Sequence, residues 1–337
     1  MSLIGQYALR LQRKRLLWRA FRSRHVLRPV ANRTRQIARG DILLFSTLRN
    51  EKVRLPYFFD YYRDLGVKHF LIVDNDSRDG SRKWLKQQPD CSVWTTKASY
   101  RRARFGVDWL NWLQTRYGNG HWTLVADVDE FLVFPFCDTR PLNALTDWMD
   151  ASAIRALPAM LLDMYPKGPI DAQTYVEGQN PIEIASWFDS GNYAIEKNHR
   201  YQNLWIQGGP RARYFFGDQP HNAPALNKTP LVKWKRGYAY VESTHMVLPR
   251  GLNQVYDEQG GECISGVMLH TKFLNTFVEK STEEIKRQQH YGRSREYKAY
   301  ARQLETKQPD LWNTWSEKYI NWRQLEILGL MSKGNWA

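Results

Sequence analysis

The sequence predicts an α/β protein with a mostly parallel sheet flanked by helices. Between residues 41 and 126, short apolar runs alternate with longer amphipathic stretches, and Gly or polar residues separate them. In such an alternation each helix carries the chain back, so that consecutive strands lie parallel. The 337 residues, 42% hydrophobic and 25% charged, are also enough to bury a core of this kind.

Four apolar runs are the expected strands, and three stretches between them are the expected helices. The helix at 54–65 (RLPYFFDYYRDL) ends before Gly66, and the helix at 105–117 ends before Gly118. Glycine is typical of helix C-termini because it adopts the left-handed conformation without strain. A third, short helix is expected at 81–88. The expected strands are 42–47, 68–73, 92–96 and 121–126.

Beyond residue 135 the alternation weakens. Residues 165–230 are rich in Gly, Pro, Asn and aromatic residues, which is typical of a loop-rich binding region. Further elements are a surface helix at 141–150, strands within 230–248 and at 265–273, and helices from residue 276 on. We therefore divide the chain into an arm (1–40), a domain (41–275, with halves 41–137 and 138–275) and a C-terminal helical extension (276–337).

The arm is strongly basic. The formal net charge is +15, and residues 1–40 hold eleven Lys or Arg and no Asp or Glu, which leaves +4 for the rest. Four apolar residues of the arm share one helical face: Ile4, Tyr7, Leu11 and Trp18. A basic amphipathic helix is typical of contact with an anionic membrane. The alternative is a helix that packs on the body through residues 16–18. Nucleic acid is less favoured, because no basic patch continues onto the body.

Cysteine usage and hydropathy indicate the compartment. Cys91, Cys137 and Cys263 lie far apart without CxxC spacing, which argues against a disulfide framework or a cysteine zinc site. No apolar run approaches the ~18–20 residues of a membrane span, and arginines interrupt any signal-peptide core. We expect a cytoplasmic protein and, if the arm binds lipid, a peripheral one at the inner face of the plasma membrane.

Polar clusters follow three of the expected strands at the points where they end. The clusters are 46–51, 74–81 and 127–130. Because ligands bind at the carboxyl ends of the strands in such sheets, we expect the three clusters to form one site.

Asp127 and Asp129 stand in the apolar run LVADVDEFLVF, residues 124–134. On an extended backbone this spacing puts both side chains on one side. Two hard oxygen donors suit Mn²⁺ or Mg²⁺ held together with substrate phosphates. Such a cation would also compensate the cost of burying two carboxylates. The alternative is a helix N-cap or a salt bridge at a strand end.

The stretches IVDNDSRDGS and, about fifty residues later, LVADVDEFLVF resemble the nucleotide-sugar half of a GT-A glycosyltransferase. They are similar to family 2-like bacterial enzymes with the acidic motif D-x-D-E-F/L, and STLRNE resembles the family's opening strand. The resemblance covers 41–137 well and extends less closely to about residue 275. It implies a GT-A fold, in which a Rossmann-like, mostly parallel sheet carries a loop-rich acceptor region.

The resemblance also implies residue roles. Asp74 is expected to contact uracil or ribose, and the motif of Asp127 and Asp129 to bind the metal and diphosphate of a UDP- or GDP-sugar. Arg104 is expected to meet a phosphate. The same nucleotide pocket would include Thr47, Asn50, Glu51 and Asp76.

Many GT-A enzymes complete the metal shell with a C-terminal histidine. His270 in VMLHTKF ends an apolar strand, so it is the predicted metal ligand. Lys272, two residues on, would face the same site as a cation for the leaving diphosphate. His245 in VESTHMV is the other candidate, and we assign it to catalysis, because a carboxylate or histidine must deprotonate the acceptor hydroxyl.

Family relatives usually invert the anomeric centre with an Asp or Glu from an acidic pair. This chain has no clean acidic pair at the expected place, so the base is open among Asp189, Asp218 and Glu242. Asp189 in SWFDSGNY is the first choice, because it lies among aromatic residues that would stack on sugar. We expect the acceptor to meet Arg211 of GGPRAR and to stack on Trp205.

Three hypotheses follow. The first is a metal-dependent glycosyltransferase that moves a hexose from a nucleotide sugar to a glycan or lipid-linked acceptor in bacterial surface polysaccharide synthesis. The second is a nucleotidyl- or phosphotransferase that uses the same pair of aspartates. The third is a non-catalytic basic protein associated with membrane or nucleic acid. Fold alone does not decide among them.

Overall fold

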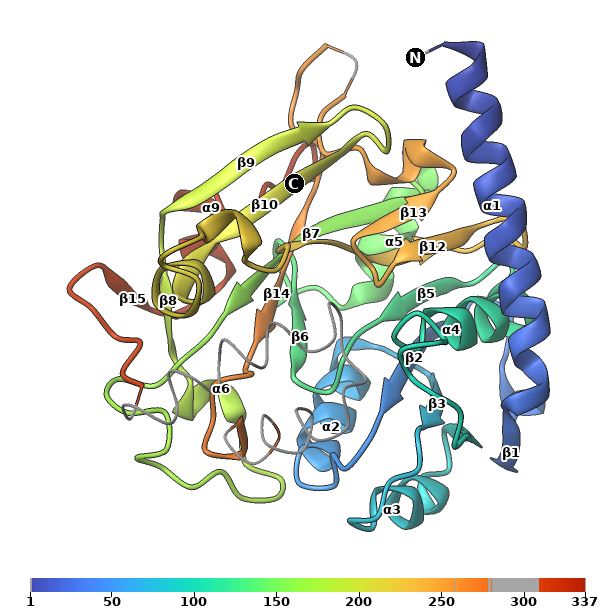
Figure 1. Cartoon of the computed structure of the whole chain (residues 1–337), viewed down its shortest axis with the longest axis horizontal. Helices are drawn as coiled ribbons and strands as arrows, with labels where there is room; N and C mark the ends of the chain where they lie inside the picture. The colour runs from blue at the N-terminus through green and yellow to red at the C-terminus, as the bar shows by residue number, and fades with distance from the viewer. Residues whose placement is uncertain (1, 258, 278–279, 281–308, 337) are drawn as a thin grey trace.

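The computed structural model describes residues 2–257, 259–277, 280 and 309–336. A nine-stranded sheet crosses the molecule in the order β1-β4-β3-β2-β5-β11-β7-β14-β6 (Figure 1). Its strands are β1 (Arg28–Ala31), β2 (Ile42–Leu48), β3 (His69–Asp74), β4 (Cys91–Thr95), β5 (Trp122–Val125), β6 (Glu130–Val133), β7 (Ala156–Asp163), β11 (Asn227–Lys233) and β14 (Gly266–His270).

Most strands of this sheet run in one direction. The pairs β2–β3, β3–β4, β2–β5 and β7–β14 are parallel, whereas β11 lies antiparallel between β5 and β7. The edge strands β1 and β6 are also antiparallel to their neighbours. Six strands therefore point the same way: β2, β3, β4, β5, β7 and β14. The predicted α/β fold with a mostly parallel sheet is confirmed.

Helices cover both faces of the sheet. Successive strand residues point to opposite faces, so Leu44 packs in one core with α2 and α5, and Leu43 packs in another core with α4. Gly66 ends α2 in the left-handed conformation, as predicted. The described helices are α1 (Leu3–Ser23), α2 (Leu55–Leu65), α3 (Ser81–Gln87), α4 (Val107–Leu113), α5 (Leu142–Ala151), α6 (Pro181–Ile184) and α9 (Trp322–Ile327).

The second half of the chain holds more regular structure than its sequence suggests. β7 was not expected, because a strand buried on both faces shows no alternation of polar and apolar residues. Within the region expected to be loop-rich, β9 (Tyr193–Asn198) and β10 (Asn203–Gly208) form a hairpin. Two further small sheets pair β12 (Ala239–Glu242) with β13 (Met246–Leu248), and β8 (Trp187–Asp189) with β15 (Ser316–Lys318).

The expected C-terminal helices fall mainly on residues 278–279 and 281–308, which lie outside the described residues. Of the predicted extension, the structure describes α9 and β15. Within the described part of the chain, no helix is both long enough and apolar enough to cross a membrane.

The N-terminal arm forms a helix that packs on the body. Along one side of the molecule, α1 lies against α4 and β12 through Leu9, Leu16 and Ala20 (Figure 1). Trp18, expected among the packing residues 16–18, instead points outward with 60% of its surface exposed. Residues 28–31 of the arm form β1, so part of the arm belongs to the sheet.

Arg54 connects α2 to the end of β14 from a buried position. Its Nη1 donates to the carbonyl oxygen and the hydroxyl of Thr271 at 3.0 and 3.2 Å, and its Nε lies 3.6 Å from Glu51. We expect Arg54→Met to lower the free energy of unfolding by about 3 kcal/mol, because it leaves buried acceptors without their donor. Urea unfolding measures this.

Arg78→Met is the matched control, since the Arg78 side chain is 79% exposed. The prediction fails if both variants lose the same stability.

Candidate active site

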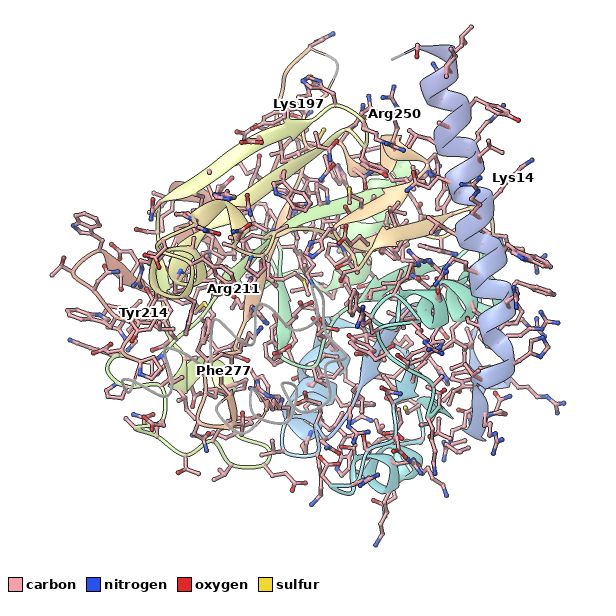
Figure 2. All side chains as sticks on the ribbon, viewed as in Figure 1. Lys14, Lys197, Arg211, Tyr214, Arg250 and Phe277 are labelled. Atoms are coloured by element: carbon pink, nitrogen blue, oxygen red, sulfur yellow. The ribbon has the colours of Figure 1, made fainter. Side chains whose placement is uncertain are left out.

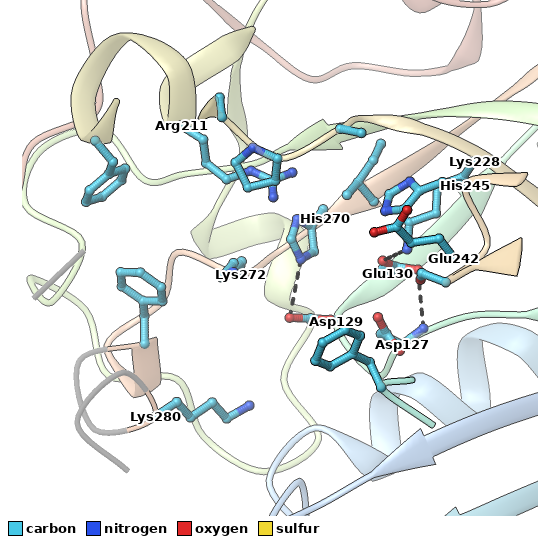
Figure 3. A pocket seen from close by; sticks show the side chains of 18 of the residues that line it. Asp127, Asp129, Glu130, Arg211, Lys228, Glu242, His245, His270, Lys272 and Lys280 are labelled. Carbon is cyan, nitrogen blue, oxygen red and sulfur yellow. Dashed lines mark hydrogen bonds and ion pairs between the residues drawn. The ribbon is translucent and has the colours of Figure 1, made fainter. Parts of the chain in front are cut away.

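A cavity of about 940 Å³ opens at the carboxyl ends of β2, β3 and β5 (Figure 3). All three polar clusters predicted at this edge contribute to it. From them come Thr47, Asn50, Glu51, Asn75, Asp127, Asp129 and Glu130. The opposite wall comes from the second half of the chain and includes Trp205, Arg211, Asp218, Lys228, Glu242, His245, His270 and Lys272. Sequence-distant segments thus meet in one pocket.

Asp129 and His270 face each other in this pocket. The Nε2 of His270 lies 3.5 Å from Oδ2 of Asp129, and its Nδ1 lies 2.7 Å from Oδ1 of Asp163. Strand register explains this arrangement, because His270 pairs with Asp163 across β7–β14 and with Glu130 across β14–β6. Arg211 closes the row, with its Nε donating to Oδ2 of Asp163 at 2.7 Å.

The row of charges shifts the pKa of each member. Burial alone raises the pKa of Asp129, but the charge and hydrogen bond of His270, together with the charges of Arg54 and Lys280, outweigh it and hold that pKa well below its usual value. Burial alone lowers the pKa of His270, but Asp129 and Asp163 raise it above its usual value. At Asp163 the cost of burial is outweighed by Arg211 and His270, which lower its pKa.

Glu130 has a structural partner. It forms a buried ion pair with Lys228 of β11 at 2.5 Å, and its other oxygen accepts the backbone N–H of Asp127 at 3.3 Å. Burial, followed by the charge of Glu130, raises the pKa of Asp127 to about 7. Lys228 thus compensates part of the negative charge that this apolar run brings into the sheet.

A third group of charges lies at the start of α2. Glu51 accepts from the ammonium of Lys280 at 2.5 Å and lies beside Arg54. Burial raises the pKa of Glu51 and lowers that of Lys280. In Figure 3, His270 reaches Asp129 from above, and Lys272 and Lys280 lie to the left of Asp129. Carboxylates at this edge of the sheet therefore have cationic partners in the pocket.

Asp129 and His270 are the two side chains that could together hold a divalent cation. Among the described residues, no group of three His, Cys, Asp or Glu side chains is arranged as a complete metal site. A carboxylate and an imidazole nevertheless provide two ligands, and Mg²⁺-type sites commonly complete their shell with substrate phosphates and water. Asp127 lines the same pocket beside this pair.

Three predicted nucleotide contacts do not line the pocket. Asp74 is completely buried, and Nε of Arg82 donates to its Oδ2 at 2.7 Å. Asp76 lies 3.7 Å from Arg49 in a loop outside the cavity. Arg104 forms an ion pair with Asp108 at 2.6 Å. These partners, which sequence spacing did not reveal, replace the predicted nucleotide contacts.

Asp189 is not placed to act as the base. It lies outside the cavity, where Arg213 donates to both of its carboxylate oxygens and the hydroxyl of Tyr165 also donates to it. The Trp205 side chain does line the pocket, as expected of an acceptor contact. Arg211 also lines the pocket, but its guanidinium is buried and bound to Asp163. Because Asp163 also binds His270, Arg211 helps to position His270.

Three other candidates for the base do line the pocket: Asp218, Glu242 and His245. The Nδ1 of His245 lies 2.6 Å from the Asn227 carbonyl oxygen, and burial, followed by the charge of Lys228, lowers the pKa of His245 to about 4. Burial raises the pKa of Glu242. His245 is therefore neutral near pH 7, and Glu242 is the stronger proton acceptor of these two.

Asp163, Lys228 and Lys280 had no predicted role. Asp163 closes the apolar run ALPAMLLD, so it follows the pattern that identified Asp127, an apolar strand ending in aspartate. Lys228 lies in a stretch rich in Pro and Asn, and nothing local marks it as the partner of Glu130.

No protein-family model and no curated protein matches this chain. Among solved structures, it is similar to 4-diphosphocytidyl-2C-methyl-D-erythritol synthase, with 18% sequence identity and a TM-score of 0.25. The likeness covers 43% of this chain and 68% of that one. At this identity and score, the likeness says nothing about activity.

The raised pKa of His270 predicts a pH-dependent contribution to stability in metal-free protein. The contribution is complete below the unfolded value, near 6.5, and is lost as the pH rises through the folded-state pKa. We expect His270→Gln to cost more stability at pH 6 than at pH 9, as measured by urea unfolding in EDTA.

His25→Gln, at an exposed position before β1, is the control for this measurement. If the cost of His270→Gln is constant or grows with pH, the ion pairs of His270 do not stabilise the fold.

Proposed function

We propose that this protein is a metal-dependent glycosyltransferase that uses a nucleotide-sugar donor. The observation that carries the proposal is the pairing of Asp129 with His270 at 3.5 Å, beside Asp127, in the large pocket at the carboxyl edge of the sheet. This combination is what the resemblance to GT-A glycosyltransferases led us to expect, and its two members come from the first and second halves of the domain.

The pocket also suits the donor. Its volume lies at the upper end of ligand sites, which usually measure about 300–1,000 Å³. Asp129 and His270 would hold Mn²⁺ or Mg²⁺, with Asp127 beside them. Lys272 and Lys280 lie on the facing wall, where cations stabilise a diphosphate. The nucleoside would contact residues at the end of β2, namely Thr47, Asn50 and Glu51.

The reaction breaks the bond between the sugar's anomeric carbon and the diphosphate oxygen, and the nucleoside diphosphate leaves with the bonding electrons. A cation held by Asp129 and His270 would supply positive charge for the leaving diphosphate. The acceptor hydroxyl oxygen forms the new bond to the anomeric carbon, and its proton passes to a base. We assign the base to Glu242, because it lines the pocket and its burial raises its proton affinity.

The acceptor is proposed as a class of molecule. Trp205 offers an aromatic face for a sugar ring, and its ring centroid lies 6.5 Å from that of His245. A glycan or lipid-linked acceptor of bacterial surface polysaccharide fits this wall. We place this activity in the cytoplasm, and it does not require a contact with nucleic acid.

Nucleotide binding tests the donor proposal. We expect UDP or GDP to raise the Tm only when Mn²⁺ is present, by an amount equivalent to about 3 kcal/mol at roughly one hundred times Kd. Asp129→Ala should abolish the shift, because it removes a metal ligand. Differential scanning calorimetry measures both.

Asp171→Ala, at an exposed position outside the pocket, makes the same change of side chain and should keep the shift. Stabilisation by nucleotide that is the same with EDTA and with Mn²⁺ would sink the proposal.

Donor hydrolysis tests the base, because water can replace the missing acceptor. Among a panel of UDP- and GDP-sugars, the true donor should be hydrolysed slowly in the presence of Mn²⁺. Glu242→Gln should lower this rate about 100-fold and leave the Mn²⁺-dependent Tm shift intact. Glu317→Gln, an exposed change remote from the pocket, should leave both unchanged. An unaltered rate in Glu242→Gln would remove Glu242 from this role.

A further inference from the structure

An apolar ridge runs along the outer side of α1. Ile4, Tyr7, Leu11 and Trp18 follow the i, i+3, i+7, i+14 spacing of one helical face, and they are 82%, 62%, 38% and 60% exposed. This ridge is about 21 Å long at 1.5 Å per residue. No described part of the chain buries any of these four side chains as fully as a core residue is buried.

The opposite face of α1 fixes the helix to the body. Leu9 and Leu16 are buried there with Ala239 and Leu248. Arg19 donates to Asp108 of α4 at 3.0 Å, and Gln12 donates to the Tyr201 hydroxyl at 2.9 Å. The helix is thereby held in an orientation that keeps its apolar ridge toward solvent.

Basic side chains lie on both sides of the ridge, and Lys14 and Arg22 fall within the same helical face. Arg10, Lys14, Arg15 and Arg22 are exposed, and α1 contains no Asp or Glu. Long basic side chains beside an apolar helix face can bury their stems while their charged ends reach lipid phosphates. Lys14 is labelled on α1 in Figure 2.

A basic groove continues this charge beside the N-terminal half of the helix. It lies between α1 and the β9–β10 hairpin, and Figure 2 shows Lys197 and Arg250 there. No acidic residue of the described chain lines it. Its lining is Gly5, Ala8, Lys197, His199, Arg200, Gln202 and Arg250.

We propose that α1 lies on an anionic lipid bilayer, with Ile4, Tyr7, Leu11 and Trp18 in the interface and the surrounding basic residues, including the groove, on lipid phosphates. A second copy of the chain fits less well, because it would bring two rows of like charge together. Nucleic acid would leave the apolar ridge in water. The inference is independent of the proposed glycosyltransferase activity, since binding needs neither donor nor metal.

Vesicle sedimentation of the full chain tests this proposal. We expect binding to phosphatidylcholine vesicles to strengthen at least ten-fold when one third of the lipid is phosphatidylglycerol, because each basic residue near the surface adds attraction. The combined change Ile4→Ser, Leu11→Ser, Trp18→Ser should weaken binding about ten-fold. Its matched control replaces three exposed apolar residues near the C-terminus, Trp315, Ile320 and Ile327, by Ser and should bind normally.

A second set of variants separates charge from the apolar ridge. Lys14→Gln, Arg15→Gln and Arg22→Gln together should weaken the preference for anionic lipid at least ten-fold. An equal change of charge near α3, Arg78→Gln with Lys83→Gln and Lys86→Gln, should leave the preference for anionic lipid unchanged. Circular dichroism and Tm establish that every variant is folded.

Three outcomes would overturn the proposal. The first is that the chain binds neither kind of vesicle, and the second is that the apolar triple variant binds as the wild type does. The third is a dimer in size exclusion that only the apolar triple variant dissociates, which would assign the ridge to a second copy. Failure of vesicle binding leaves Mn²⁺-dependent nucleotide binding untouched, so the two proposals are tested separately.

Discussion

The site depends on one row of alternating charges, Arg211, Asp163, His270 and Asp129, in which each carboxylate lies beside a cation. Buried charges are costly unless they are paired, so no member is independent of its neighbours. The row exists because β7, β14 and the turn before β6 end at the same level. A one-residue slip of β14 would turn His270 to the other face of the sheet. The register of the strands therefore determines which charged groups meet in the pocket.

The charged residues of the molecule form two separate groups, one in the pocket and one in the arm. Within the pocket, acids and bases are matched, as in the Glu130–Lys228 and Glu51–Lys280 pairs. The excess positive charge of the chain lies mainly in the arm, which carries +11 of the net +15. The pocket can thus meet a ligand that combines a cation with phosphates, while the arm presents positive charge to a different, extended surface.

The sequence by itself determined the first half of the sheet and the edge at which the pocket opens. Strands and helices between residues 42 and 126 follow local rules of periodicity and helix termination, so their boundaries were predicted to within one or two residues for most elements. Asp127, Asp129 and His270 were placed at strand ends by the same rules, and all three line one cavity. Apolar runs that end in polar residues carry this information locally.

Only the tertiary structure decided which charged groups pair with each other. Asp74 and Asp189 look like Asp127 in the sequence, yet Arg82 and Arg213 bind them outside the pocket. Asp163 becomes part of the site through β7, which was not expected, and Lys228 through the start of β11, which lies before the strand region predicted from residue 230. The physical reason is that burial and ion pairing depend on the register between strands far apart in the chain, and a local pattern of residues does not encode that register.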